Sequence, residues 1–262
     1  MPRQQRKKSI SGIYHCILRG INKQDIFFEN QDYIKFFDIL GKSKKLFHFE
    51  LYSYILMPNH IHLEIKEKND SLSKIMQNIG VAYATYFNKK YNRVGHLFQN
   101  RFKSKAVETQ IYMLNLLRYI HQNPEQAGIE KMEKYKWSSY NEYINKKILT
   151  DTEIVLKFFS KDNKKAIEEF VTFNNMKIGH FESDEILEFE IKEYLTDSEL
   201  IEIIKDKLQI KNLQDIQKYS KKSRDELLKK LSQISGWTYK QMSRVLGINI
   251  RIIQRAIKEI ER

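Results

Sequence analysis

The sequence has a single cysteine, Cys16, among its 262 residues, and it has no long uninterrupted hydrophobic run. One cysteine excludes an internal disulfide and favours a reducing compartment. No segment reaches the roughly 18 consecutive apolar residues that a membrane span needs. The basic start MPRQQRKK is not followed by the apolar segment of a signal peptide. We therefore expect a soluble, cytoplasmic protein with no membrane partner.

Positive charge dominates the composition, with 46 Lys and Arg residues against 33 Asp and Glu residues and a net charge of +13. This excess favours a polyanionic partner such as nucleic acid, although it could also serve solubility alone. The charge is uneven, since residues 1–147 carry +12, residues 148–205 carry −7 and residues 206–262 carry +8. We expect a first DNA-contacting domain over 1–147, an acidic helical connector over 148–205 and a second DNA-binding module over 206–262.

The first domain alternates between strand and helix patterns. We expect Asn30, Ser71 or Ser73, and Thr109 to cap its helices and Pro124 to end the last one. The order strand, helix, strand, strand, helix, strand predicts an α+β fold, a ferredoxin-like antiparallel sheet with helices on one face. The expected strands are 12–20, 49–58, 60–67 and 101–108, and the expected helices are 30–47, 71–91 and 109–123.

Two histidines lie close together in the stretch ILMPNHIHLEI, which covers residues 55–65. Side chains two residues apart in a strand project from the same face, so His60 and His62 would lie side by side. A histidine pair on a strand is more often structural than functional. Two neighbouring imidazoles nevertheless form half of a metal site.

The stretch RYIHQNP, residues 118–124, offers groups that complement such a site. Tyr119 and Asn123 are four residues apart on an expected helix and therefore share a face. Asn123 would supply an amide oxygen, and the Tyr119 phenol is a nucleophile that can attack a phosphodiester. His121 falls on another face of the helix, where we expect a surface residue or a weak DNA contact.

Several motifs together resemble a known family, the single-tyrosine HUH transposases, and in particular their REP-associated branch. These motifs are MPNHIHLEI, YATYFNKKYNRVGHLFQNRFKS, LLRYIHQNPEQAGI and YKWSSY, spread over about residues 10–145. The resemblance implies an HUH nuclease domain that cleaves single-stranded or hairpin DNA. It implies Mg²⁺ or Mn²⁺ held by His60, His62 and Asn123, although insertion-sequence relatives usually carry Gln at the last position. Tyr119 would form a 5′-phosphotyrosine and free a 3′-hydroxyl.

Basic residues near these motifs are expected to contact DNA phosphates. They follow the second expected helix or lie beside the tyrosine, and aromatic residues are interleaved with them, as in proteins that bind single strands. The expected contacts are Arg93, Arg101, Lys103, Lys105 and Arg118.

The C-terminal stretch 223–262 predicts a helix-turn-helix within an all-α region. A short helix would end at Gly247, because a helix C-terminus favours a residue that tolerates positive φ. Arg251, Gln254 and Arg255 would then face outward on a recognition helix. A plain three-helix interaction module is the alternative. The expected core residues are Leu227, Leu228, Leu231, Ile250, Ile253 and Ile257.

These patterns favour a metal-dependent tyrosine DNA endonuclease and strand transferase, a transposase. One alternative is a catalytically silent, sequence-specific DNA-binding regulator of the same fold. Another is an RNA-binding module, which would carry aromatic residues on its sheet rather than a histidine pair; Tyr52 and Tyr54 point weakly that way. The sequence leaves open whether the protein is a monomer or a homodimer.

Overall fold

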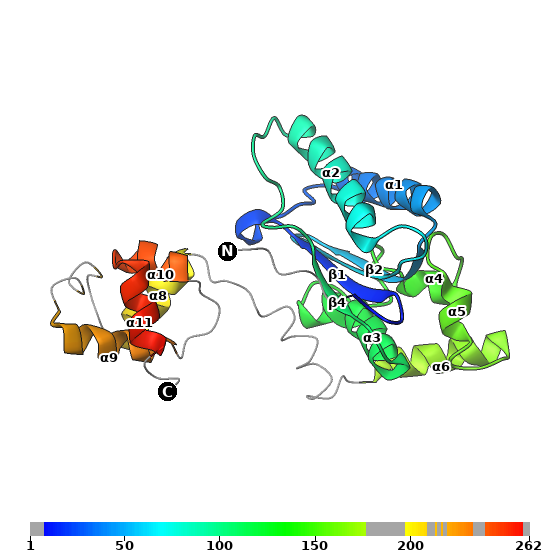
Figure 1. Cartoon of the computed structure of the whole chain (residues 1–262). Helices are drawn as coiled ribbons and strands as arrows, with labels where there is room; N and C mark the ends of the chain where they lie inside the picture. Colours follow the sequence, from blue (N-terminus) through cyan, green and yellow to red (C-terminus); the bar gives the residue numbers. More distant parts are fainter. Residues whose placement is uncertain are drawn as a thin grey trace. The chain divides into compact units, whose positions relative to one another are not determined.

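The chain forms two compact units, residues 1–184 and 185–262. The structure is a computed structural model, and it describes residues 8–176, 197–208, 213, 216, 219–232 and 239–258 (Figure 1). Each unit is described by itself below. None of the helices in these ranges is long and apolar enough to cross a membrane.

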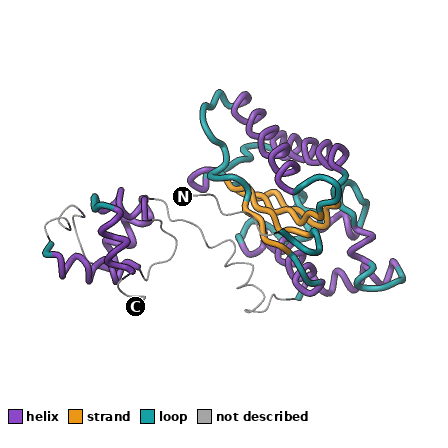
Figure 2. The backbone as a smooth tube through the Cα atoms, viewed as in Figure 1, coloured by secondary structure: helices purple, strands orange, loops and turns teal. Residues whose placement is uncertain are grey.

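A four-stranded antiparallel sheet organises the first unit (Figure 2). Its spatial order is β2-β3-β1-β4, so that the first and third strands of the chain are the central pair. This order and the succession of strands and helices confirm the predicted ferredoxin-like sheet. The strands are β1 (Ile13–Arg19), β2 (Glu50–Met57), β3 (His60–Lys66) and β4 (Lys103–Ala106).

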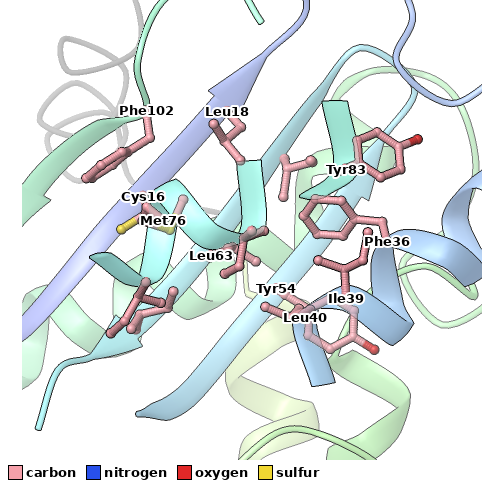
Figure 3. Close-up of a cluster of buried hydrophobic side chains, with 14 of the residues drawn as sticks. Cys16, Leu18, Phe36, Ile39, Leu40, Tyr54, Leu63, Met76, Tyr83 and Phe102 are labelled. Atoms are coloured by element: carbon pink, nitrogen blue, oxygen red, sulfur yellow. The ribbon is translucent and has the colours of Figure 1, made fainter. Parts of the chain in front are cut away.

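Helices cover both faces of this sheet, so the expectation of helices on one face only was wrong (Figure 1). The helices α1 (Asn30–Phe47) and α2 (Leu72–Lys90) lie on one face, and α3 (Gln110–Gln126) lies on the other. Because strand side chains alternate, Cys16, Leu18 and Leu63 point towards α1 and α2 and form the main core with residues such as Phe36 and Tyr83 (Figure 3). The side chains of the intervening strand residues point towards α3, on the other face of the sheet.

One expected N-cap and one expected helix end were wrong. The bounds of α1 are as predicted, but its N-cap is Glu29 rather than Asn30, because Asp32 accepts a hydrogen bond from the Glu29 N–H and completes a capping box. Thr109 does cap α3, but Pro124 does not end it. Proline removes only one hydrogen bond in the last turn, and the helix continues to Gln126, two residues before Gly128, whose φ of 67° turns the chain away.

The segment after residue 148 begins as part of the first unit. Phe170 is fully buried and stacks on Tyr143, with ring centroids 4.4 Å apart. Along the sequence, the boundary between the compact units falls after residue 184, within the segment 148–205 that was expected to connect two domains. The helices here are α4 (Tyr140–Ile144), α5 (Thr152–Leu156) and α6 (Asn163–Asn175), and a short 3-10 turn, η1 (Ile21–Lys23), follows β1.

All secondary-structure elements described in the second unit are helices. Gly247 has a φ of 64° and follows the third helix directly, as predicted. Ile253 is buried and Ile257 packs against the core, but Ile250 is only half-buried at a helix start and is not part of it. Leu200 and Ile204 add a further helix to this core. The helices are α8 (Asp197–Leu208), α9 (Lys221–Ser232), α10 (Tyr239–Leu246) and α11 (Ile250–Lys258).

A buried carboxylate, Asp32, joins the start of α1 to the end of α2. It accepts hydrogen bonds from Lys90 Nζ at 2.5 Å and from the Tyr91 hydroxyl at 2.7 Å. The backbone N–H groups of Phe28 and Glu29 donate to one of its oxygens. Burial raises the pKa of Asp32, but these hydrogen bonds outweigh burial and leave the pKa below its usual value.

We expect Asp32→Asn to lower the free energy of unfolding by about 3 kcal/mol at neutral pH, because it breaks a buried ion pair. The folded-state pKa is depressed, so this contribution is present above the unfolded value near about 4 and is lost as the pH falls through the folded value. Urea unfolding of the full chain at several pH values measures both effects.

Asp38→Asn is the matched control, because Asp38 pairs with Lys42 on the exposed side of the same helix. Such pairs contribute about 0.5 kcal/mol or less. Equal losses in the free energy of unfolding for the two variants would show that Asp32 stabilises the fold no more than an exposed aspartate does.

Candidate active site

The histidine pair lies on the sheet face that α3 covers. Ile61, between the two histidines, belongs to the core under α1 and α2, so His60 and His62 project from the opposite face. In the antiparallel pairing of β1 with β3, His62 lies opposite Ile17 and His60 lies opposite Arg19. The two imidazole centroids are 4.8 Å apart and their planes are nearly perpendicular.

Hydrogen bonds at Nδ1 orient both imidazoles. His62 Nδ1 lies 2.9 Å from His15 Nε2, and His60 Nδ1 lies 2.6 Å from Asn59 Oδ1. The Asn59 amide is turned this way because its Nδ2 donates to the Lys23 carbonyl. With a proton on each Nδ1, both Nε2 atoms keep a lone pair, the arrangement that a metal ligand requires.

Helix α3 brings the other two predicted residues to this face. The Tyr119 ring lies edge-on to His62, with centroids 6.0 Å apart, and only 3% of the residue is exposed. The Asn123 side chain lies close enough to His60 to influence its pKa. The structure therefore gathers the histidine pair, the phenol and the amide within a single chain.

The electrostatics keep the imidazoles neutral. Burial and the positive charge of Arg19 lower the pKa of His62 to about 3. Burial, His62 and Arg19 lower the pKa of His60 well below its ordinary value, and the opposing effect of the Asn123 side chain, which raises this pKa, is smaller. Burial also lowers the pKa of His15. Neutral imidazole is the form that coordinates metals.

The donor set fits a hard or borderline divalent cation held loosely. Two imidazole nitrogens and one amide oxygen leave several coordination positions for water and phosphate oxygens, as Mn²⁺ and Mg²⁺ prefer. A closed structural zinc site would need four ligands. No group of three or more His, Cys, Asp or Glu residues suited to a metal occurs among the described residues.

Two of the predicted DNA-binding lysines share the face of the site. On β4, Lys103 lies opposite Ile17 and Lys105 lies opposite His15, and directly opposed residues project from the same side of a sheet. Lys105 Nζ lies 4.7 Å from the centre of the Tyr112 ring on α3. These two lysines therefore lie on the same sheet face as the histidine pair, on the far side of β1.

The three predicted arginines of this unit differ in their surroundings. Arg101 is exposed, and Arg93 is half-buried and donates to Gln24 Oε1. Arg118 is buried with 4% exposed, and its guanidinium lies over the Phe173 ring at 4.4 Å. The structure thus packs Arg118 against α6 rather than presenting it at the surface.

The expectation of a surface position for His121 was wrong. His121 is fully buried, its Nδ1 lies 2.9 Å from Asn174 Oδ1, and its Nε2 lies 2.8 Å from Ser139 Oγ. Burial lowers its pKa to about 4, so the ring is neutral. The face of α3 that points away from Tyr119 is covered by α6 and by the segment around α4, a long-range contact that helical spacing does not reveal.

These hydrogen bonds fasten the helix that carries Tyr119. Ser139 Oγ also accepts from the Tyr54 N–H of β2, so β2, α3 and α6 are joined through His121. Gln122 Nε2 donates to the carbonyls of Asn174 and Met176 at 2.6 and 2.8 Å. These contacts, on the face of α3 opposite to Tyr119, fix the rotation of the helix about its axis and therefore the direction in which the Tyr119 side chain points.

The buried carboxyl of Glu64 is another group that the sequence analysis did not single out. It lies opposite His15 on the site face and accepts a hydrogen bond from the Ser53 hydroxyl at 2.8 Å. Burial raises its pKa to about 8. Glu64 follows His62 by two residues in the same strand, so the alternation of strand side chains could have predicted its position on this face.

In the second unit, the predicted recognition residues lie on α11. Arg251 and Arg255 are exposed and Gln254 is half-buried. Asn249 Oδ1 accepts from the Arg251 N–H at 2.9 Å, which caps the start of this helix.

Residues 8–123 match the model of the family described as "Transposase IS200 like". The match is to this segment of the chain, and it agrees with the resemblance predicted from the motifs. The matched segment contains the strands of the sheet, the histidine pair, Tyr119 and Asn123.

Two solved structures are also similar to the chain. One is a REP-associated tyrosine transposase bound to a REP hairpin, with 18% identity, 58% of this chain and 93% of that chain covered, and a TM-score of 0.48. The other is a candidate transposase from Deinococcus radiodurans R1, with 16% identity, coverages of 46% and 97%, and a TM-score of 0.34. No curated protein matches the chain significantly.

We expect His121→Phe to lower the free energy of unfolding by about 2 kcal/mol, because a ring of similar size leaves Ser139 Oγ and Asn174 Oδ1 without their partner. Urea unfolding of the full chain measures the loss. In a double-mutant cycle with Asn174→Ala, we expect a coupling energy of about 1 kcal/mol.

His48→Asn is the control, since His48 is exposed and occupies a left-handed C-cap position that asparagine tolerates. Additive losses for His121→Phe and Asn174→Ala would show that the two side chains do not act together.

Proposed function

We propose that this protein is a metal-dependent tyrosine DNA endonuclease and strand transferase. The observation that carries the proposal is the placement of the Tyr119 ring beside His62, with Asn123 close to His60 one helical turn later. A phenol, two neutral imidazoles and an amide are a sufficient set for phosphodiester transesterification.

In the proposed reaction, the Tyr119 oxygen attacks the scissile phosphorus. A bond forms between phosphorus and the phenolic oxygen, and the bond from phosphorus to the 3′-oxygen breaks. The phenolic proton passes to solvent, and the departing 3′-oxygen takes up a proton. The product is a 5′-phosphotyrosine and a free 3′-hydroxyl, and attack by a hydroxyl on the phosphotyrosine rejoins DNA. The number of phosphoester bonds is conserved, so the step needs no energy source.

His60, His62 and Asn123 would hold the divalent cation, Mg²⁺ or Mn²⁺. When bound, this cation polarises a non-bridging phosphate oxygen and stabilises the charge that develops in the reaction. His15 and Asn59 keep the two imidazoles in the required tautomer through their Nδ1 hydrogen bonds. His121 holds α3 in position from its opposite face.

The substrate of the first unit is proposed to be single-stranded or hairpin DNA. Lys103 and Lys105 lie on the face of the site, where they can neutralise backbone phosphates, and Arg93 and Arg101 extend this basic surface along the segment before β4. Arg118 is assigned a packing role here, because its guanidinium lies against Phe173.

The second unit is proposed to bind DNA with α11. Residues 206–262 carry a net charge of +8, and α10 and α11 are joined by a turn at Gly247, as in a helix-turn-helix. Arg251 and Arg255 would contact phosphates or base edges, with Gln254 beside them.

One observation favours a second candidate function, a catalytically silent DNA-binding regulator of the same fold. Tyr119 is only 3% exposed, so DNA can reach its hydroxyl only after local movement. The two functions differ in a single product, the covalent adduct between protein and DNA.

We expect Tyr119→Phe to abolish covalent capture of single-stranded hairpin DNA, because phenylalanine lacks the attacking oxygen. Binding of the same DNA should change by less than about threefold, since the ring remains. Incubation of a hairpin library with the full chain and Mn²⁺, followed by denaturing electrophoresis, reveals the adduct. Tyr86→Phe on α2 is the matched control and should keep full capture.

An excess of chelator should also stop capture, and added Mn²⁺ should restore it. Full capture in chelator would refute the metal requirement, and capture by Tyr119→Phe would remove Tyr119 from its role. A wild-type chain that binds hairpins without capturing any would support the silent regulator.

We expect replacement of Arg251 and Arg255 by alanine to weaken duplex binding in a salt-dependent way. The slope of log affinity against log salt should fall by about 1 for each arginine that touches a phosphate in the wild type. Fluorescence anisotropy over a salt series measures it. Arg244→Ala is the control, because Arg244 is held by two hydrogen bonds to Asp197. An unchanged slope in the double variant would exclude a phosphate contact by these arginines.

A further inference from the structure

We propose that Arg19 is a catalytic residue that contacts the scissile phosphate beside the metal ligands. This inference rests on the proposed function and adds a residue that neither the motifs nor the family match assigns. The guanidinium would donate hydrogen bonds to the non-bridging oxygens of the phosphodiester that Tyr119 attacks.

The sheet register places Arg19 at the site. Arg19 is the last residue of β1 and lies directly opposite His60 on β3. Its neighbour Leu18 belongs to the core under α1 and α2, so Arg19 projects from the face that carries His60 and His62. Directly opposed residues have Cβ atoms about 4.5–5.5 Å apart, and Arg19 is half-buried there.

The backbone around Arg19 is held rigidly. The Arg19 carbonyl accepts from the Gln99 N–H at 3.0 Å, and the Gly20 N–H donates to the Asn59 carbonyl at 2.9 Å. Residue 20 must be glycine, because a Cβ there would lie 2.1 Å from the Gln24 carbonyl oxygen. The main chain of Arg19 is thereby fixed beside Asn59, whose side chain orients His60.

Arg19 lies directly opposite His60, and His62 lies one row further along the same sheet face, so the positive charge of Arg19 is close to both proposed metal ligands. A guanidinium stays protonated at every physiological pH. A divalent cation on two neutral imidazoles would therefore lie close to a second positive charge. Such a pair of cations repel each other, and an anion that touches both removes the repulsion. A phosphodiester supplies that negative charge.

The buried carboxyl of Glu64 also lies on this face. It is opposite His15, in a different row of the sheet from Arg19, and its Oε2 accepts from Ser53. The row that contains Arg19 pairs it with His60 and, on β2, with Met57. In this register the residue directly opposite His60 on β1 is Arg19 and not a residue with a carboxyl group. Asn123 lies close to the same histidine.

The geometry suits the reaction already described. A guanidinium binds two phosphate oxygens with parallel N–H donors, and the hydrogen bonds strengthen as negative charge accumulates on those oxygens. Arg19 transfers no proton in this step. Tyr119 approaches from α3, whereas Arg19 belongs to the strand at the floor of the site, so the phosphate would lie between them.

The test uses Arg19→Ala and Arg19→Lys in the full chain, with hairpin DNA and Mn²⁺ at saturation. We expect the single-turnover rate of covalent capture to fall by about 100-fold or more in Arg19→Ala. Arg19→Lys should recover part of this rate, because it restores the charge without the planar pair of donors. Lys45→Ala, which removes an exposed charge from α1 on the other face, should keep the wild-type rate.

A second readout does not depend on cleavage. Mn²⁺ binding, followed by electron paramagnetic resonance, should be unchanged or tighter in Arg19→Ala without DNA, because a repulsive charge is removed. Hairpin DNA should tighten Mn²⁺ binding by the Tyr119→Phe variant, which cannot cleave. The increase in Mn²⁺ affinity caused by DNA should be smaller in the double variant Tyr119→Phe, Arg19→Ala. This difference tests the contact between Arg19 and the phosphate independently of cleavage.

A capture rate within threefold of the wild type, or weaker Mn²⁺ binding in Arg19→Ala, would overturn the proposal. The first result would show that Arg19 does not act in the step, and the second that it only supports the ligands. Failure of the proposed function looks different. The wild type would then form no adduct, while the coupling between Mn²⁺ and DNA would still report on Arg19.

Discussion

The antiparallel pairing of β1 with β3 is the constraint on which the candidate site depends. It sets Arg19 beside His60 and brings His15 within hydrogen-bond distance of His62. A shift of one residue in this register would turn either set of side chains into the apolar core under α1 and α2. The large buried side chains of that core, such as Leu18, Ile61 and Leu63, therefore stabilise the site face as well as the fold.

The chemistry requires that α3 be as well positioned as the sheet. Three polar contacts of α3 achieve this, those of His121 with Asn174 and Ser139 and that of Gln122 with the end of α6. Polar groups with all partners satisfied specify one arrangement more sharply than apolar packing alone. The segment 148–176 thus supports the candidate site from the side of α3 opposite to Tyr119, although its residues are remote from the histidines in sequence.

The sequence predicted the elements well because their signals are local. Alternation in β1 and β3, helical spacing in α1 to α3 and the positive φ at Gly247 depend on neighbouring residues only. The same is true of His60 with His62 and of Tyr119 with Asn123. The partners of His15, His121 and Arg19 depend on strand register and on helix packing across long stretches of chain, which spacing does not encode. The misplaced N-cap at Asn30 and the misplaced helix end at Pro124 had local causes, the competing capping box of Asp32 and the late Gly128.

The hydrogen bond from Gln122 to the Met176 carbonyl has a mechanical consequence. Gln122 stands between Tyr119 and Asn123 on α3, and Met176 directly follows α6. The end of α6 is therefore fastened to the turn of α3 that bears both side chains. A displacement of α6 within the first unit would pass to that turn through this hydrogen bond.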